Sequence, residues 1–239
     1  MRDFWRTSLL AAAVVGVLLL MARTNGYARD LTPLAATLIA FREMDWFTRP
    51  TDHHLENTWV MWDRSLLSWM GPAIEGLRAA GFLELCYVLV YAVGPVSLAI
   101  LLLNRRRDQV NRFWLAYLAG TLGAYALFPY FPSQPPRILF PDADLPVLTM
   151  LRRFNLFILG NYSIHSSVFP SAHVSSAFSA AWVFLSAIPE RRYLGWAMAL
   201  YAFCVSIATI YGRYHYAADA AAGLAMSLLA AVVLRWIKE

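Results

Sequence analysis

The stretch Phe82–Leu103, "FLELCYVLVYAVGPVSLAILLL", decides the class of fold. A helix needs ~17–25 mainly apolar residues to cross a bilayer, and this run has that length with one charged side chain. Over the 239-residue chain, 59% of residues are hydrophobic and 15% are charged, whereas a soluble domain carries roughly 25% charged residues. The sequence therefore predicts an all-α, polytopic membrane protein.

Further apolar runs bring the predicted number of transmembrane helices to six. They are Thr7–Ala22, Phe113–Phe128, Pro170–Ile188, Tyr193–Tyr211 and Ala217–Ile237. No small-x-small cleavage site follows the first run, which favours an uncleaved anchor over a signal peptide. We therefore divide the chain into residues 1–81, an anchor span with an exterior interfacial segment, and residues 82–239, a five-span core.

The short connections predict the orientation in the membrane. Residues 104–112 and 189–192 fall on the same side as both termini, and this side holds ten of the twenty Lys and Arg residues. By the positive-inside rule it is cytoplasmic, and we expect a bacterial inner membrane. Because these cations flank apolar runs, the net charge of +5 indicates contact with membrane lipids and not with nucleic acid. Residues 23–81 and 129–169 are then exterior.

Two parts of the first exterior stretch are predicted to lie at the membrane interface. Leu31–Phe41 is apolar but too short to span. Residues 55–80 contain Trp59, Trp62 and Trp69 among polar residues, which is typical of an amphipathic helix with an aromatic belt. Anchoring is the favoured role of this helix, and a cap over a lipid-binding entrance is the alternative.

Three polar clusters fall on the exterior side, each beside an apolar run. They are "PSQPPR" (residues 132–137), "PSAH" (170–173) and "GRYHYAAD" (212–219). Ionisable groups at membrane depth are costly and mark functional sites. Their convergence on one side predicts an exterior-facing active site within the helical bundle.

The histidines of these clusters are the candidate catalytic residues. His215 and Asp219 are four residues apart, so on a helix their side chains share a face, and the carboxylate can fix the tautomer of the imidazole. His173 lies in the first turn of a predicted helix, where it can give a proton to a leaving oxygen. Ser171, beside free N–H groups at the start of that helix, is a candidate anion ligand.

Two arginines are candidate phosphate ligands. Arg137 follows two prolines that stiffen the backbone, and Arg213 lies two residues before His215; the planar guanidinium of each suits phosphate oxygens. We expect Arg152 and Arg153 to contact lipid headgroups instead.

No cofactor is predicted. The chain has no H-E-x-x-H motif or carboxylate pair that would supply a metal ligand set, and we expect His53 and His54 to be solvent-exposed. Cys86 and Cys204 lie inside apolar runs, which favours packing over a disulfide or a thiolate site.

From about residue 82 onward the chain resembles the type 2 phosphatidic acid phosphatase superfamily, which includes lipid phosphate phosphatases and vanadium haloperoxidases. The three motifs of that superfamily are, in order, a basic residue that precedes an Arg-Pro pair, the sequence P-S-G-H, and the pattern S-R-x5-H-x3-D. The resemblance implies that His215 is the nucleophile that forms a phosphohistidine and that Asp219 orients it. It also implies that His173 is the acid for the leaving group and that Ser171 and Arg137 bind phosphate oxygens.

The motifs depart from that pattern at several positions. Ala172 replaces glycine, Ala208 and Thr209 stand near the usual place of the third-motif arginine, and the first motif has no long basic lead. These relaxed motifs look more like the inositol phosphorylceramide synthase branch. The favoured function is a metal-independent lipid phosphate phosphatase; the alternatives are a lipid headgroup phosphotransferase with an alcohol or lipid acceptor, and a non-catalytic lipid-binding or transport protein.

Overall fold

The fold is that of a computed structural model, which describes residue 16 and residues 26–47, 53–74, 77–141, 145–164 and 167–236. Within these ranges the secondary structure is helical and contains no strand. The helices are α2 (Tyr27–Phe47), α3 (His54–Ile74), α4 (Leu77–Leu89), α5 (Val93–Leu103), α6 (Val110–Leu127), α7 (Pro136–Leu139), α8 (Met150–Tyr162), α9 (Ala172–Ala187), α10 (Arg192–Tyr211) and α11 (Ala217–Trp236).

Three of the predicted spans are long and apolar enough to cross a membrane. They correspond to Arg78–Leu103, Pro189–Tyr211 and Ala217–Arg235. The fourth, α9, is apolar but has 16 residues, and α6 has 18 residues that include polar and aromatic side chains. The first predicted span, Thr7–Ala22, lies outside the described residues apart from residue 16.

The first of these long helices contains a short 3₁₀ segment. Val90–Ala92 separates α4 from α5 without ending the helix. Pro95 lacks an N–H, so the carbonyl of Tyr91 loses its usual helical partner and the turn tightens. The tightened turn lies beside the active site described below.

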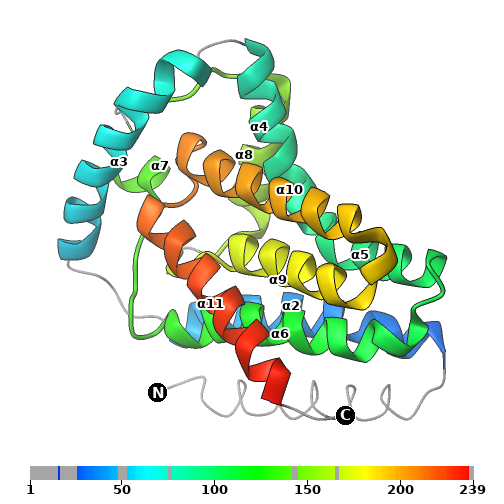
Figure 1. Cartoon of the computed structure of the whole chain (residues 1–239). Helices are drawn as coiled ribbons and strands as arrows, with labels where there is room; N and C mark the ends of the chain where they lie inside the picture. The colour runs from blue at the N-terminus through cyan, green and yellow to red at the C-terminus, as the bar shows by residue number, and fades with distance from the viewer. Residues whose placement is uncertain are drawn as a thin grey trace.

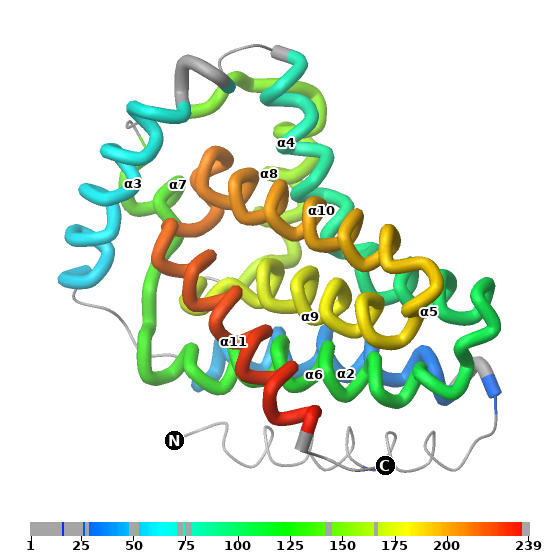
Figure 2. Tube along the Cα trace, in the orientation of Figure 1, coloured from blue at the N-terminus to red at the C-terminus, as the bar shows by residue number. Residues whose placement is uncertain are grey.

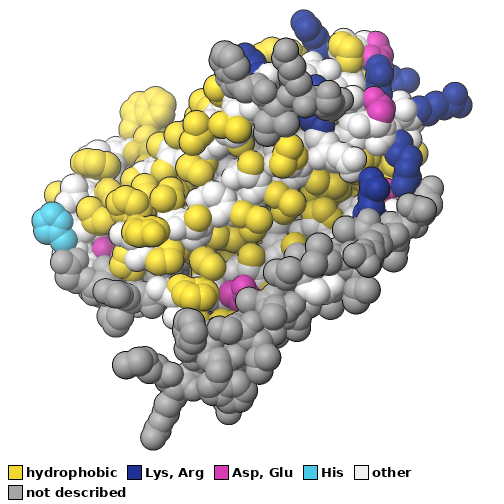
Figure 3. Space-filling model, turned by 90° about the horizontal axis from the view of Figure 1, so that it is seen from below, with side chains coloured by type: hydrophobic (Ala, Val, Ile, Leu, Met, Phe, Trp, Pro, Cys, Tyr) yellow, Lys and Arg dark blue, Asp and Glu magenta, His cyan; other side chains and the backbone are white. Residues whose placement is uncertain are grey.

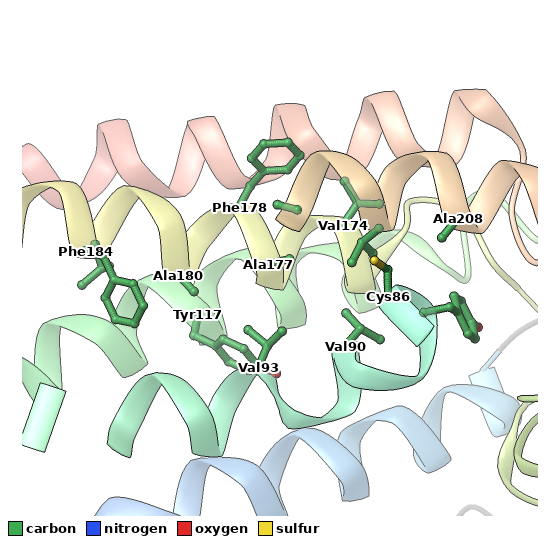
Figure 4. Packing of buried hydrophobic residues seen from close by; sticks show 14 of the residues in the cluster. Cys86, Val90, Val93, Tyr117, Val174, Ala177, Phe178, Ala180, Phe184 and Ala208 are labelled. Atoms are coloured by element: carbon green, nitrogen blue, oxygen red, sulfur yellow. The ribbon is translucent and has the colours of Figure 1, made fainter. Parts of the chain in front are cut away.

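Helix α9 is the centre of the bundle. It packs against α6, α10 and α11, and these four helices form the layered centre of Figure 1. Figure 4 shows the α9 side chains Val174, Ala177 and Phe184 among those of the neighbouring helices, and all three are buried. On the α6 side, a Cβ on Gly120 would meet the Ser175 hydroxyl oxygen at 2.7 Å, so small residues let these helices approach closely.

Helix α2 corrects one sequence-based prediction. Asp30, near its start, pairs with Arg107 in the α5–α6 connection at 2.8 Å. Arg42, near its end, donates from Nη1 to the carbonyl of Tyr162 at 3.2 Å, at the opposite end of the bundle. Figure 2 shows α2 running alongside α6 between these ends. Leu31–Phe41 is therefore part of a helix that traverses the bundle, and not a short segment confined to one interface. Because Asp30 lies at the same end as residues 104–112, the prediction that all of residues 23–81 lie on the opposite side is also wrong.

Helix α3 is not simply an interfacial anchor either. Trp62 and Trp69 are exposed as expected, but Trp59 is buried and stacks on Phe169 at a ring-centroid distance of 5.0 Å. Trp59 also contacts Tyr216 at 5.6 Å, immediately before α11. One face of α3 therefore covers the segments that carry two of the polar clusters.

The two short connections lie at one end of the bundle. Arg106 pairs with Glu190 at 2.6 Å, and Arg191 donates to the side-chain oxygen of Asn104 at 2.9 Å. Seen from below, the described surface is largely hydrophobic, and Arg and Lys side chains gather toward this same right-hand end (Figure 3). The three polar clusters lie at the other end of the helices, as the alternating helix directions predict.

Candidate active site

The loop between α10 and α11 holds His215 in a fixed orientation. Its backbone N–H donates to the carbonyl of Thr209 at 3.1 Å. Its ring Nδ1 lies 3.1 Å from Oδ2 of Asp219, an oxygen that also accepts the Tyr216 N–H at 2.9 Å. The helix begins only at Ala217, so Asp219 binds both the imidazole and a free N–H of the first turn. The predicted His215–Asp219 pair is present.

The state of His215 suits a nucleophile. Burial, and after it the positive charge of Arg137, lower the pKa of His215 below its ordinary value of 6.5. A neutral imidazole that donates from Nδ1 to Asp219 carries its lone pair on Nε2. The His215 ring lines the cavity described below.

His173 lies beside His215, on the first turn of α9. The two ring centroids are 6.0 Å apart and the planes are perpendicular. Tyr87 of α4 and Tyr91 of the 3₁₀ segment contact the His173 ring in T-shaped arrangements, at centroid distances of 5.5 and 5.2 Å. A group bound between the two histidines therefore has an imidazole on each side.

The contact between α9 and α11 brings the two histidines together. The Ser171 N–H donates to the carbonyl of Asp219 at 3.0 Å. Gly223, one turn further along α11, packs directly against the backbone carbonyl of Ser171, where an added Cβ would overlap it. Only glycine permits this approach, which sets the separation of His173 and His215.

Arg137, at the start of α7, lies beside the two histidines. Its N–H donates to the carbonyl of Arg213 at 3.0 Å, and its Nη1 to the carbonyl of Tyr214 at 3.4 Å. Its guanidinium carbon lies 5.7 Å from the centre of the Tyr214 ring. Arg137 is therefore attached to the same loop that carries His215.

These side chains share one cavity of about 430 Å³, within the usual range for small-molecule sites. Arg137 supplies its guanidinium, and His173 and His215 supply its imidazoles. Most of the remaining lining is apolar or aromatic and includes Leu34, Leu38, Phe41, Val90, Pro95, Phe128, Ile158 and Leu159. A cavity with this lining suits an amphiphile that carries an anionic group.

A comparison with known protein families matches residues 58–233 to the PAP2 superfamily, the type 2 phosphatidic acid phosphatases. The chain belongs to the PAP2 superfamily. The match covers most of the chain and begins within α3, before the predicted division at residue 81. Comparisons with curated proteins and with solved structures found no match.

Two residues predicted to bind phosphate, Ser171 and Arg213, do not line the cavity. Ser171 is buried as the N-cap of α9, where its Oγ accepts the Val174 N–H at 3.4 Å. Arg213 is completely buried and pairs with Asp63 of α3 at 3.2 Å. Its backbone has a positive φ of 60°. The side chain therefore contacts α3 and does not line the cavity.

A buried ionic network behind the His215 loop was not predicted. Arg152 was expected to contact lipid headgroups, but it is 4% exposed and pairs with Glu84 at 3.0 Å. Glu84 also accepts from Asn155 and from the Tyr214 hydroxyl, each at 2.6 Å. Arg152 further donates to the carbonyl of Gly212 at 3.0 Å. The signal that could have found the network is Glu84 itself, the one acidic residue in an apolar run.

The remaining polar candidates do not form a metal site. Among the described residues, no group of three or more His, Cys, Asp and Glu side chains is placed to hold a metal ion. His53, expected in solvent, is partly buried with its ring 3.3 Å from Glu56, whereas His54 is exposed. Neither residue lines the cavity that Arg137, His173 and His215 share.

Proposed function

We propose that this protein is an integral membrane lipid phosphate phosphatase that acts through a phosphohistidine. Membership of the PAP2 superfamily supports phosphatase or phosphotransferase chemistry in general. The observation that carries the specific proposal is the shared cavity, in which Arg137 and two histidines face a mainly apolar wall. In this proposal the helices of the bundle, α2 included, cross a bacterial inner membrane, and the cavity opens on the exterior side.

The first step transfers the phosphoryl group to the protein. Nε2 of His215 attacks phosphorus, the bond from phosphorus to the leaving oxygen breaks, and His173 gives that oxygen its proton. Asp219 stabilises the positive charge that develops on His215. Arg137 binds the phosphate oxygens, and its attachment to the loop of His215 holds the phosphate in line with the nucleophile.

The second step releases the phosphoryl group to water. The neutral His173 now accepts a proton from the attacking water, whose oxygen bonds to phosphorus while the Nε2–phosphorus bond breaks. These steps use only side chains of this chain, so we expect turnover to persist with a chelator of divalent metals. We also expect vanadate to inhibit, because it mimics the geometry of phosphoryl transfer.

Transfer to an alcohol is the second candidate function. The apolar extension of the cavity favours it, because a second lipid could approach the phosphohistidine there and exclude water. The departures of the first and third motifs from the superfamily pattern also favour transfer to an alcohol. The two functions share the first step and differ only in the acceptor of the second.

The test supplies phosphate-labelled phosphatidate, prenyl diphosphate and phosphoinositide to the purified protein in lipid micelles with a chelator, together with ceramide and diacylglycerol. His215→Ala is the control. Label released as free phosphate supports the phosphatase, and label in a new lipid supports the transferase. If the wild-type protein and His215→Ala are indistinguishable, the catalytic proposal is wrong and the lipid-binding or transport alternative remains.

A further inference from the structure

Helix α2 precedes the region that matches the PAP2 superfamily, yet it forms part of the catalytic cavity. The family match begins at residue 58, whereas α2 ends at Phe47. Leu34, Thr37, Leu38 and Phe41, spaced by three or four residues along one face of α2, all line the cavity. This wall is therefore contributed by an element outside the matched region.

Helix α2 is held against the bundle along its length. The ion pair of Asp30 with Arg107 and the hydrogen bond from Arg42 fix its two ends. Between them, Leu34 lies against Gly94, where an added Cβ would come within 2.5 Å of its Cδ2. The Phe41 ring contacts Tyr125 of α6 at 5.6 Å. These contacts make α2 a fixed wall of the cavity.

The cavity extends from the histidines toward the part of α2 that contains Leu34. Tyr87 and Tyr91 contact His173, and Pro95, which also lines the cavity, lies one to two helical turns further along the same span. At 1.5 Å per residue, the distance from Tyr87 to Pro95 is roughly 12 Å along the helix axis. Leu34 lies over Gly94, at that far end. The cavity thus has a polar end and an apolar end.

The cavity also reaches the outer surface at α2. Leu38 lines the cavity although 66% of its surface is exposed. An apolar chain could therefore enter from the side, between α2 and its neighbours, without passing the charged groups. This geometry suits a substrate whose phosphate lies at the histidines and whose chain lies in a bilayer.

We propose that α2 forms the binding site for the hydrophobic chain of the substrate and that Leu34, Leu38 and Phe41 determine which chain lengths are accepted. This proposal rests on the proposed function, because it takes a lipid phosphate as the ligand. The chain passes into the cavity from lipid and not from water, so selectivity depends on how closely the chain packs against these side chains and on the depth of the apolar end.

The first test measures kcat/KM for phosphatidates of increasing chain length with the full chain in detergent micelles. Leu34→Ala deepens the apolar end and should move the chain length with the highest kcat/KM to longer chains. Leu34→Phe fills the apolar end and should move it to shorter chains. Each variant should change the ratio of long-chain to short-chain kcat/KM by about ten-fold. Leu31 is the matched control, because it lies on α2 but does not line the cavity. The proposal is overturned if the Leu34 and Leu31 variants share the wild-type profile.

The second test does not need turnover. A phosphatidate with a diazirine at the end of its chain is photolysed with the wild-type protein and with His215→Ala, and adducts are mapped by mass spectrometry. Adducts within residues 34–41 are expected in both proteins, whereas adducts confined to other segments would contradict the site on α2. A wild-type protein that hydrolyses no phosphate ester but is labelled on α2 would refute the proposed function and leave the chain site standing.

Discussion

The buried network of Glu84 and Arg152 gives the sharpest prediction about stability. Arg152→Leu removes the positive charge while Glu84, which is 1% exposed, keeps only the neutral donors Asn155 and Tyr214. Removing one partner of a buried ion pair costs about 3–5 kcal/mol in free energy of unfolding. For a chain of this size, each kcal/mol lowers the unfolding temperature by about 2–4 °C, so the expected decrease is roughly 6–20 °C.

Thermal unfolding of the purified protein in detergent micelles, followed by circular dichroism, measures this decrease. Arg153→Leu is the control, because Arg153 is the next residue and is exposed; its effect should stay within about 0.5 kcal/mol. Replacing both Glu84 and Arg152 by leucine should recover much of the loss, since no charge is then left buried without a partner. Equal unfolding temperatures for the Arg152 and Arg153 variants would refute the reasoning.

The remaining predictions concern the two histidines. Asp219→Asn should lower kcat by about 10²–10⁴-fold, because His215 loses the carboxylate that orients it and stabilises its charge. A loss smaller than ten-fold in steady-state assays would contradict this role. Gly223→Ala should lower kcat by about ten- to hundred-fold, because the added methyl group pushes α11 away from Ser171. Gly160→Ala is the control, since an added Cβ there meets no atom within 4 Å, and it should leave kcat unchanged. Equal kcat values for the two variants would contradict this effect. Because the pKa of folded His215 lies below 6.5, the unfolded chain binds more protons below that pH. The stability from neutral His215 is thus fully present above pH 6.5 and is lost as the pH falls toward the folded pKa. His215→Ala should then flatten the decline of unfolding temperature below pH 6.5, and parallel curves would show that His215 does not contribute.

The convergence of the three polar clusters could be predicted from the sequence because it depends on local rules. Apolar runs joined by short connections alternate in direction, so Arg137, His173 and His215 were expected at one end of the bundle. The His215–Asp219 contact was expected from their spacing, but the helix begins two residues after His215, so Asp219 contacts a residue that precedes the helix and not a neighbour on its face. Such features require only chain direction and helix geometry.

The side-chain partners could not be predicted in the same way, because they depend on contacts between segments far apart in the sequence. Arg213 has the spacing of a phosphate ligand, but its positive φ turns it toward Asp63, 150 residues earlier. Arg152 lies in the first turn of α8, and its partner Glu84 is 68 residues away. Local patterns carry no information on such pairings.

Helix α2 was misjudged for a related reason. Its apolar residues are interrupted by Pro33 and by charged residues near both ends, so the sequence indicates a short interfacial segment. Those charged residues, Asp30 and Arg42, are the ones that attach the helix to opposite ends of the bundle. The same side chains that lower its hydropathy thus fix its position.

The most direct test of the central claim is to trap the covalent intermediate. Phosphate-labelled phosphatidate is mixed with the protein in micelles, the reaction is quenched within milliseconds in alkali, and the peptides are analysed by mass spectrometry. We predict an acid-labile phosphoryl group on His215 that is absent from His215→Ala. Turnover without a phosphoryl group on His215, or with one on His173 instead, would contradict the account.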